Sequence, residues 1–515
     1  MAKTQISNNT HWRFEVPETL SVGRFMDQLT EQFTVSTQPK QPTLKIYYDS
    51  FDWRLYSNGF LCEFIQTKST SHLRLLRLDN QQLVSRTDVA IVPNFANQLN
   101  SSALREIIEP LLEMRALLSI CSFKYNSLPI AIINAEQKIV LRLQLDIYPN
   151  SAHQLVLHPV KGYKIQTEQV LEVLTRQLGL IPYPLPLLFH ELKRQGRKPK
   201  EYSAKLAINL APDMRADVAS KYIYSHLLKT IKDNTQGVIH DTDSEFLHDF
   251  RVAVRRTRAG LSQIKNVFPE SINARYSEFF SWLGQITGPT RDLDVYLLNF
   301  ERYKTSLPDE HRAAIQSLYD FLLHKQQKAQ AELAVKLNSE KFSTTLKEWE
   351  SYLKEEVIKK PLEANAKLTI KTRANTRIWK VINRVMQEGN AITEQSAAES
   401  LHNLRKTCKK LRYLMEFFQN LYPEKDIKLL IGYLKALQEV LGDFQDYQVQ
   451  ESHLRLFSEE MAVQHVSLET LTAIDILIGN LHSHSQQARH TFKEQFMAFK
   501  KTENQSLYSA LFRNH

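Results

Sequence analysis

A pattern of basic residues at helical spacing occurs twice in this chain, at an offset of 154 residues, and restricts the fold more than any other feature. The spacing in residues 245–268 predicts one amphipathic helix, with a cationic arc of about 80° beside an apolar arc. The cationic arc holds His248, Arg251, Arg255 and Arg258, and the apolar arc holds Leu247, Phe250, Val254, Leu261 and Ile264. Such a helix packs along one stripe and presents positive charge along the next.

The second copy, in residues 401–418, places His402, Arg405, Lys409 and Arg412 at the corresponding positions. The flanking residues follow the same offset. Thr242 with Glu245 and Ser396 with Glu399 have capping-box spacing, and Pro269 and Pro423 follow the two helices. These matches predict an internal duplication, with repeat one at about 212–360, repeat two at about 376–515, and residues 361–375 linking two helical bundles.

Three further cations, Arg256, Lys406 and Lys410, adjoin the two rows and complete the set of candidate anion-binding residues. Arg256 and Lys410 lie about 80° from the histidines around the helix, so each is expected to contact either the rim of a site or a partner helix. His248 and His402 are candidates for either a ligand contact or a structural hydrogen bond. A histidine among arginines is expected to be neutral until a polyanion binds, so binding should strengthen as the pH falls.

Composition predicts a soluble protein with an acidic partner. A chain of 515 residues is too long to fold around one hydrophobic core. Its net charge of +10 favours a polyanion as the binding partner. The three cysteines lack a C-x-x-C spacing, which argues against a disulfide framework or a zinc site and for a reducing cytoplasm. The sequence shows no signal peptide and no apolar run of about 20 residues, so we expect a cytoplasmic protein without a membrane partner.

Residues 1–200 predict an α+β domain. Short β-rich segments at 43–48, 59–66, 72–78 and 138–147 predict antiparallel strands, and residues 102–118 and 167–178 predict helices, the second with Thr167 as its N-cap. A proline-rich and then basic segment predicts a domain boundary near residues 195–212. From residue 216 onward, apolar residues at spacings of three and four predict an all-α domain, 212–515, of two pseudo-symmetric bundles.

The segment from His248 to Arg258, HDFRVAVRRTR, resembles the CHAD family, the conserved-histidine α-helical domain, whose motif has the form H-x-x-R-V-x-x-R-R-x-R. The resemblance includes Leu283-Gly284 followed by Arg291-Asp292-Leu293-Asp294, and an echo at Leu441-Gly442 followed by Asp446. It implies two pseudo-symmetric helical bundles that bind inorganic polyphosphate. If such a protein is cytoplasmic, as its cysteines predict, association with polyphosphate granules is a further expectation.

The amino-terminal region resembles a degenerate CYTH domain, the triphosphate-tunnel fold, at Tyr48-Asp49-Ser50, Leu55 and Gly59-Phe60-Leu61. The family's first strand carries E-x-E-x-K, whereas residues 12–16 offer Glu15 alone. The family's arginines after the glycine are also missing. This departure implies a domain without catalytic residues, although Arg74, Arg77, Arg86, Lys124 and Arg142 could still line a basic interior.

Phosphate chemistry suits the two basic rows. Arginine offers a planar fork of donors to phosphate oxygens, and one helix from His248 to Arg258 rises about 15 Å, enough to follow several phosphates. The rows lack Asn, Gln or aromatic residues for reading or stacking bases, so nucleic acid is the second choice. We therefore expect a polyphosphate binder with no cofactor, no metal site and no catalytic residues. The alternatives are a metal-dependent triphosphatase that uses the amino-terminal tunnel and a nonspecific nucleic-acid binder, and the oligomeric state is open.

Overall fold

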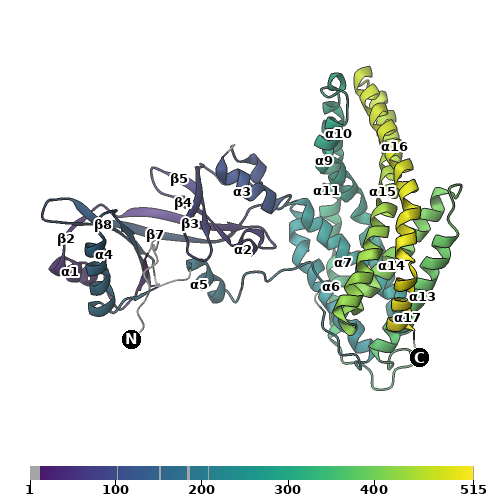
Figure 1. Cartoon of the computed structure of the whole chain (residues 1–515), viewed down its shortest axis with the longest axis horizontal. Helices are drawn as coiled ribbons and strands as arrows, with labels where there is room; N and C mark the ends of the chain where they lie inside the picture. Colours follow the sequence, from purple (N-terminus) through teal and green to yellow (C-terminus); the bar gives the residue numbers. More distant parts are fainter. Residues whose placement is uncertain (1–11, 101, 150–151, 183–185, 207, 514–515) are drawn as a thin grey trace. The chain divides into compact units, whose positions relative to one another are not determined.

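The computed structural model describes residues 12–513 except 101, 150–151, 183–185 and 207. The sequence predicts no signal peptide at the N-terminus, and residues 1–11 of that segment lie outside the described residues. The chain divides into two compact units, residues 1–203 and residues 204–515. The first is built on an antiparallel sheet and the second on helices, as the sequence predicts (Figure 1).

A ten-stranded antiparallel sheet forms the first unit, in the order β10-β1-β9-β8-β7-β3-β4-β5-β6, with β2 paired to β7. The strands are β1 (Arg13–Val16), β2 (Thr34–Thr37), β3 (Gln41–Asp49), β4 (Phe60–Gln66), β5 (Ser71–Arg77), β6 (Leu83–Asp88), β7 (Leu118–Ile133), β8 (Ile139–Ile147), β9 (His153–Pro159) and β10 (Ile181–Pro182). The helices are α1 (Val22–Gln32), α2 (Arg54–Ser57), α3 (Ala103–Leu112), α4 (Lys164–Glu172) and α5 (Leu187–Arg194).

The two faces of this sheet differ because side chains alternate along each strand. In β1, Phe14 and Val16 point into an apolar core that includes Phe25 and Leu29 of α1 and Val170 of α4. The residues between them, Arg13 and Glu15, lie on the other face. One face therefore packs against α1 and α4. The opposite face collects polar side chains around Arg13 and Glu15, but it also packs Tyr47, Leu61 and Cys121 against Leu188 and Leu192 of α5.

The four predicted strands are confirmed as β3, β4, β5 and β8 within a residue or two at their ends. Two helix predictions need correction. The helix predicted over 102–118 ends at Leu112, two residues after Pro110, and the chain then enters β7 at Leu118. Thr167 is not an N-cap: α4 begins at Lys164, and the Thr167 hydroxyl donates to the carbonyl oxygen of Tyr163 at 3.0 Å.

The helical unit is built of two repeats whose first three helices follow the same order. The first repeat holds α6 (Ala216–Ile239), α7 (Ser244–Gln263), α8 (Glu270–Ile286), α9 (Gly288–Leu298), α10 (Phe300–Thr305), α11 (Gln316–Leu337) and α12 (Glu340–Lys354). The second holds α13 (Ile370–Asn390), α14 (Ala398–Phe418), α15 (Glu424–Val463), α16 (Leu468–Phe499) and α17 (Thr502–Phe512). The starts of α6, α7 and α8 precede those of α13, α14 and α15 by the offset of 154 residues.

The main difference between the repeats is the break after α8. Pro289, the second residue of α9, has no N–H to continue the helical ladder, whereas the matching segment of repeat two runs on as the single long helix α15. Residues of α9 and α11 share one apolar core with residues of α15 and α16, so the two repeats pack together through these helices. The structure also shortens the predicted link, because α13 begins at Ile370 with Thr369 as its N-cap.

The predicted caps also need correction. Asp243, not Thr242, caps α7, and its carboxylate accepts from the N–H groups of Glu245 and Phe246. Ser396 does not cap α14: the N-cap is Ala397, and the Ser396 hydroxyl accepts from the N–H of Thr393.

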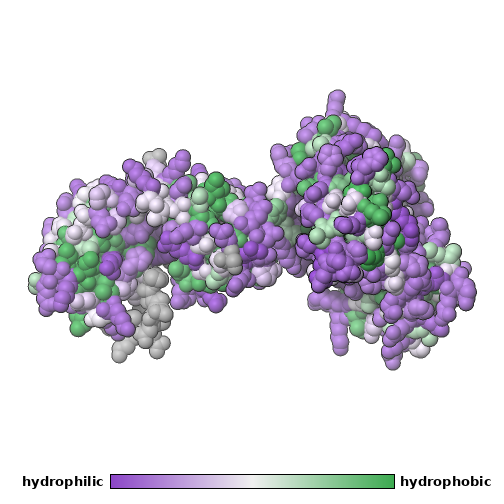
Figure 2. All heavy atoms as spheres, turned by 90° about the horizontal axis from the view of Figure 1, so that it is seen from above, coloured by the Kyte–Doolittle hydropathy of each residue, from purple (hydrophilic) through white to green (hydrophobic). Residues whose placement is uncertain are grey.

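Hydrophilic residues cover most of the visible face of the helical unit in Figure 2. Among the described residues, no helix combines the length and the apolar composition that a membrane span needs.

Candidate functional site

A cavity of about 420 Å³ lies among four helices of the second unit, α7, α9, α14 and α15. We call it the four-helix cavity. Its lining residues are His248, Arg251, Arg255, Arg291, Asp292, Val295, Tyr296, His402, Arg405, Lys409, Gln445, Asp446, Val449, Gln450 and His453. The cavity thus joins the first three members of each predicted basic row, which are about 150 residues apart in the sequence.

The other five predicted residues lie outside this lining. Arg256 pairs with Glu416 of α14 at 2.9 Å, which is the partner-helix alternative, and Arg412 pairs with the same carboxylate at 2.7 Å. Arg258 lies beside Gly284 and Ser281 of α8. Lys406 is exposed, and Lys410 lies near Arg377 and Arg384 of α13.

Arg251 is anchored on the helix break that separates α8 from α9. Its Nη1 donates to the carbonyl oxygen of Gly284 at 3.2 Å and to Oγ1 of Thr287 at 2.7 Å. Arg255, one turn further along α7, is held less tightly, because its Nε is buried without a hydrogen-bond partner among the described residues. An unpartnered guanidinium N–H in a cavity is a donor that an anionic ligand could use.

In each basic row one arginine lies close to a glycine of the neighbouring helix, and the approach is tight only at Gly284. A Cβ at Gly284 would lie 2.7 Å from Nη1 of Arg258, and a Cβ at Gly442 would lie 3.7 Å from Nη2 of Arg405. The two Leu-Gly pairs noted in the sequence therefore sit where α8 and α15 approach the basic helices. Arg405 also forms an ion pair with Asp446 of α15 at 2.9 Å.

The two histidines have different hydrogen-bond roles. Arg291 donates through Nη2 to Nδ1 of His248 at 3.2 Å, and an arginine cannot accept, so Nδ1 of His248 is unprotonated. Nδ1 of His402 lies 2.6 Å from Oε1 of Gln445 and therefore donates. His402 can take up a proton on Nε2 without losing this bond, whereas a proton on Nδ1 of His248 would displace Arg291. The predicted gain of charge on ligand binding therefore suits His402 better.

Sequence reasoning missed the residues that α9 and α15 contribute, such as Gln445 and His453, as site residues. Arg291, Asp292 and Asp446 were noted only as parts of a family motif. Their place in the motif was a usable signal, since a charged residue repeated after each Leu-Gly pair has no obvious packing role. Gln445 and His453 gave no such signal, because they belong to no motif. They line the cavity as residues of the long helix α15.

Cations outnumber carboxylates in the cavity, and they repel one another. Arg251, Arg255, Arg291, Arg405 and Lys409 face only Asp292 and Asp446. Burial, followed by repulsion from Arg405 and Arg255, lowers the pKa of Lys409 to about 8. Burial and the charge of Arg255 likewise lower the pKa of Arg251 to about 10. An anion in the cavity would relieve this repulsion.

The polar face of the first unit's sheet carries charges that are already matched. Pairing across strands places Arg74, Arg86 and Arg142 of the predicted interior on this face, and Arg77 and Lys124 on the opposite one. Glu63 pairs with Arg74 at 2.6 Å. Burial opposes ionisation of Glu63, but Arg74, Lys45 and Arg13 overcome it and hold its pKa at about 2. The ionised Glu63 carboxylate thus neutralises part of the positive charge on this face.

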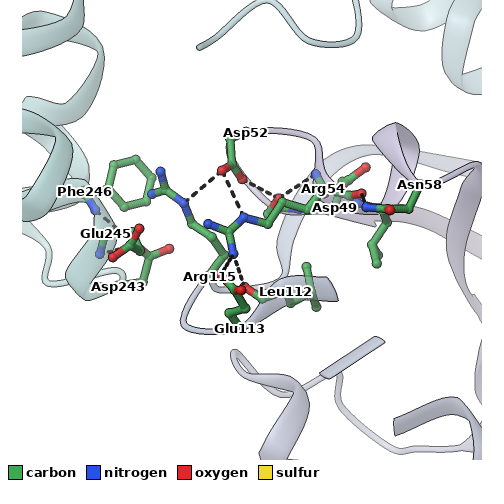
Figure 3. Close-up of polar contacts among 12 residues, drawn as sticks. Asp49, Asp52, Arg54, Asn58, Leu112, Glu113, Arg115, Asp243, Glu245 and Phe246 are labelled. Carbon is green, nitrogen blue, oxygen red and sulfur yellow. Dashed lines mark hydrogen bonds and ion pairs between the residues drawn. The ribbon is translucent and has the colours of Figure 1, made fainter. Parts of the chain in front are cut away.

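The turn after β3, which carries the second resemblance, is held by a buried carboxylate (Figure 3). Asp49 accepts from the N–H groups of Ser50, Leu55 and Tyr56 at 2.7–2.9 Å. Burial raises its pKa to about 6 even with these three donors. Asp49 therefore shapes the loop into α2 and is used structurally.

Comparison with known proteins found one family model that matches the chain and a set of similar solved structures. Residues 223–455 match the family model of the CHAD domain. The crystal structure of the CHAD domain from the plant Ricinus communis is similar at 21% identity and a TM-score of 0.46, covering 61% of this chain and 97% of that one. PptA from Streptomyces chartreusis is similar at 15% identity and a TM-score of 0.44, covering 56% of this chain and 100% of that one.

Other similar structures cover a smaller share of the chain. One is an adenylyl cyclase from Hippeastrum, described as having a dominant triphosphatase activity, at 13% identity and a TM-score of 0.26. The match covers 38% of this chain and 99% of that one. A search of curated proteins found no match.

Proposed function

Residues 223–455 of this chain form a CHAD domain, and from that premise we propose that the four-helix cavity binds inorganic polyphosphate. The observation that carries the proposal is the cavity's unbalanced charge: five cations from α7, α9 and α14 face two carboxylates. Their mutual repulsion is a cost that a chain of phosphates would remove. Each charge-assisted bond to phosphate contributes about 1.5–3 kcal/mol.

The cavity suits a phosphate chain better than a nucleic acid. It offers guanidinium and ammonium groups from both repeats, and these are the donors that phosphate oxygens use, with or without bases attached to the chain. Tyr296, the one tyrosine, phenylalanine or tryptophan among the lining residues, is buried, and its hydroxyl donates to the carbonyl oxygen of Gln450. It is therefore occupied in packing and not offered for base stacking.

We predict that long-chain polyphosphate binds in preference to duplex DNA at equal phosphate concentration and physiological ionic strength. The affinity should fall steeply with salt, because neutralising several phosphates releases their counterions. Competition of both polymers for a labelled polyphosphate, at several salt concentrations, measures the preference. Equal or tighter binding of DNA would reject the proposal in favour of a nonspecific nucleic-acid binder.

The second candidate function, a metal-dependent triphosphatase in the first unit, is the weaker one. A divalent metal on a phosphate chain needs clustered carboxylate oxygens. Glu63 is committed to Arg74, and Asp146 accepts hydrogen bonds from Ser127 and Gln144. Among the residues that the structure describes, there is no cluster of three metal-ligating side chains.

We predict that the chain releases little or no phosphate from tripolyphosphate in the presence of magnesium or manganese. The reason is that Glu15, on the polar face of β1, lacks a second glutamate beside it on that strand. A phosphate-release assay on the full chain and on Glu15→Ala tests this. Turnover at rates typical of enzymes that disappears in Glu15→Ala would establish the triphosphatase instead.

A further inference from the structure

A second group of cations lies on the side of α14 that faces α13, outside the four-helix cavity. On α13, Arg373, Arg377 and Arg384 share one face within about 40°. Lys406 and Lys410 of α14 lie one turn apart, and Lys410 is close enough to Arg377, Arg384 and Lys406 for its pKa to be lowered by them, after burial. We call these five residues the α13–α14 cluster.

Two arginines of this cluster, Arg373 and Arg377, are partly buried and incompletely hydrogen-bonded, whereas Arg384 is exposed. Arg373 donates to the carbonyl oxygen of Lys265 at 3.4 Å, and Arg377 donates to Oε1 of Gln263 at 2.7 Å. Both acceptors are neutral. The Nε atoms of both arginines are buried without a hydrogen-bond partner among the described residues. Buried donors of this kind are rare unless a ligand or water completes them.

The cluster contains little negative charge of its own. Glu388 pairs with Arg384 at 2.6 Å and also attracts Lys410. Burial lowers the pKa of Arg373 and of Arg377, and Arg377 adds repulsion at Arg373. Among the described residues, Glu388 is the one carboxylate shown to interact with members of this cluster, so positive charge is in excess here as it is in the four-helix cavity.

The cluster belongs to repeat two alone. At the offset of 154 residues, the positions of Arg373, Arg377 and Arg384 correspond to Ala219, Ile223 and Thr230 in α6. Ala219 and Ile223 are fully buried there. The duplicated helices α6 and α13 therefore serve different purposes: α6 packs its face into the core, and α13 turns the same face into a row of cations.

We propose that the α13–α14 cluster is a second phosphate-chain site, separate from the four-helix cavity. The class of ligand rests on the proposed function, while the site itself rests on its own residues. Arg373 to Arg384 spans about 16 Å along the helix, which lets the row contact several successive phosphates. Lys406 and Lys410, predicted as ligand contacts but absent from the cavity lining, take their role here.

The test is a calorimetric titration of the full chain with tripolyphosphate. We expect Lys406→Gln with Lys410→Gln to weaken one class of binding about tenfold or to remove one equivalent of bound tripolyphosphate. These changes do not touch the bonds of Arg373 and Arg377 to Lys265 and Gln263, and an unaltered circular dichroism spectrum is required of each variant. Lys336→Gln with Lys347→Gln, two exposed lysines of α11 and α12, is the matched control.

The outcomes separate this inference from the proposed function. An unchanged stoichiometry and affinity in Lys406→Gln with Lys410→Gln overturns the second site, while a loss in Arg255→Gln still supports the cavity. Binding that is reduced in the lysine variant but unaffected by Arg255→Gln supports the second site and rejects the cavity. An equal loss in the Lys336 and Lys347 control attributes the effect to net charge and rejects the second site.

Discussion

Charge reversal in either basic row of the four-helix cavity should reduce the affinity for long-chain polyphosphate by about 100-fold or more. The variants are Arg251→Glu with Arg255→Glu in α7 and Arg405→Glu with Lys409→Glu in α14. Each removes two charge-assisted contacts of about 1.5–3 kcal/mol and adds repulsion, and about 1.4 kcal/mol corresponds to a factor of ten. All four residues line one cavity, so both rows should grip the same ligand.

Because the ligand is shared, the two losses should not add. A chain released from one wall loses its alignment on the other, so the combined variant should bind little more weakly than either double variant. Fluorescence anisotropy with labelled polyphosphate measures all three. Strictly additive losses, or an equal loss from reversal of Lys336 and Lys347, would leave net charge as the explanation.

Folding must be controlled in this experiment, because Arg251 also holds Gly284 and Thr287. Circular dichroism should show unaltered helicity for every variant compared. Arg255→Gln gives a cleaner single change, since the buried Nε of Arg255 makes no hydrogen bond with the described residues. We expect it to weaken binding about tenfold, with the thermal midpoint nearly unchanged.

Polyphosphate affinity should fall about tenfold between pH 7 and pH 9. The pKa of Lys409 in the free chain is about 8, lowered by burial and by Arg405 and Arg255, with Asp446 opposing and Arg412 adding to the repulsion. A bound polyanion raises that pKa, so binding takes up a proton above pH 8 and weakens as the pH rises. Below pH 8 Lys409 is mostly charged already, so the affinity changes less with pH there.

Proton uptake gives this prediction a direct reading. Calorimetry at pH 8.5 in buffers of different ionisation enthalpy should show net uptake of protons by the wild-type chain and much less by Lys409→Gln. Lys347→Gln, a change at an exposed lysine, should behave like the wild type. A pH-independent affinity between 7 and 9, or the same uptake in Lys409→Gln, would contradict the assignment.

The sequence predicted the architecture because its strongest signals are periodic. Helical spacing and the offset of 154 residues located α7 and α14 and their matching neighbours, and alternation located β3, β4, β5 and β8. It missed β7, which contains Pro129 and whose first residue, Leu118, was assigned to the end of a helix, and it did not predict β2, β6, β9 or β10. It misplaced the cap of α7, because Thr242 has capping-box spacing to Glu245, whereas the backbone at the start of the helix makes Asp243 the N-cap.

The candidate site was predicted in part. An arc of about 80° on a helix limits which residues can face one ligand, but it cannot show where the neighbouring helices end. Arg258 therefore fell within the predicted arc yet lies beside α8, and Arg256 turned out to pair with Glu416. Lys410 lies on the α13 side of its helix, a placement that depends on how α13 packs and that no local pattern records.

A crystal structure of the chain with bound tripolyphosphate would test the central claim most directly. The proposal predicts phosphate density in the four-helix cavity, within hydrogen-bond distance of Arg251 and Arg255 from α7 and of Arg405 and Lys409 from α14. The ion pair between Arg405 and Asp446 should open, since the ligand replaces that carboxylate. Density confined to other surfaces, with the cavity side chains unmoved, would contradict the account.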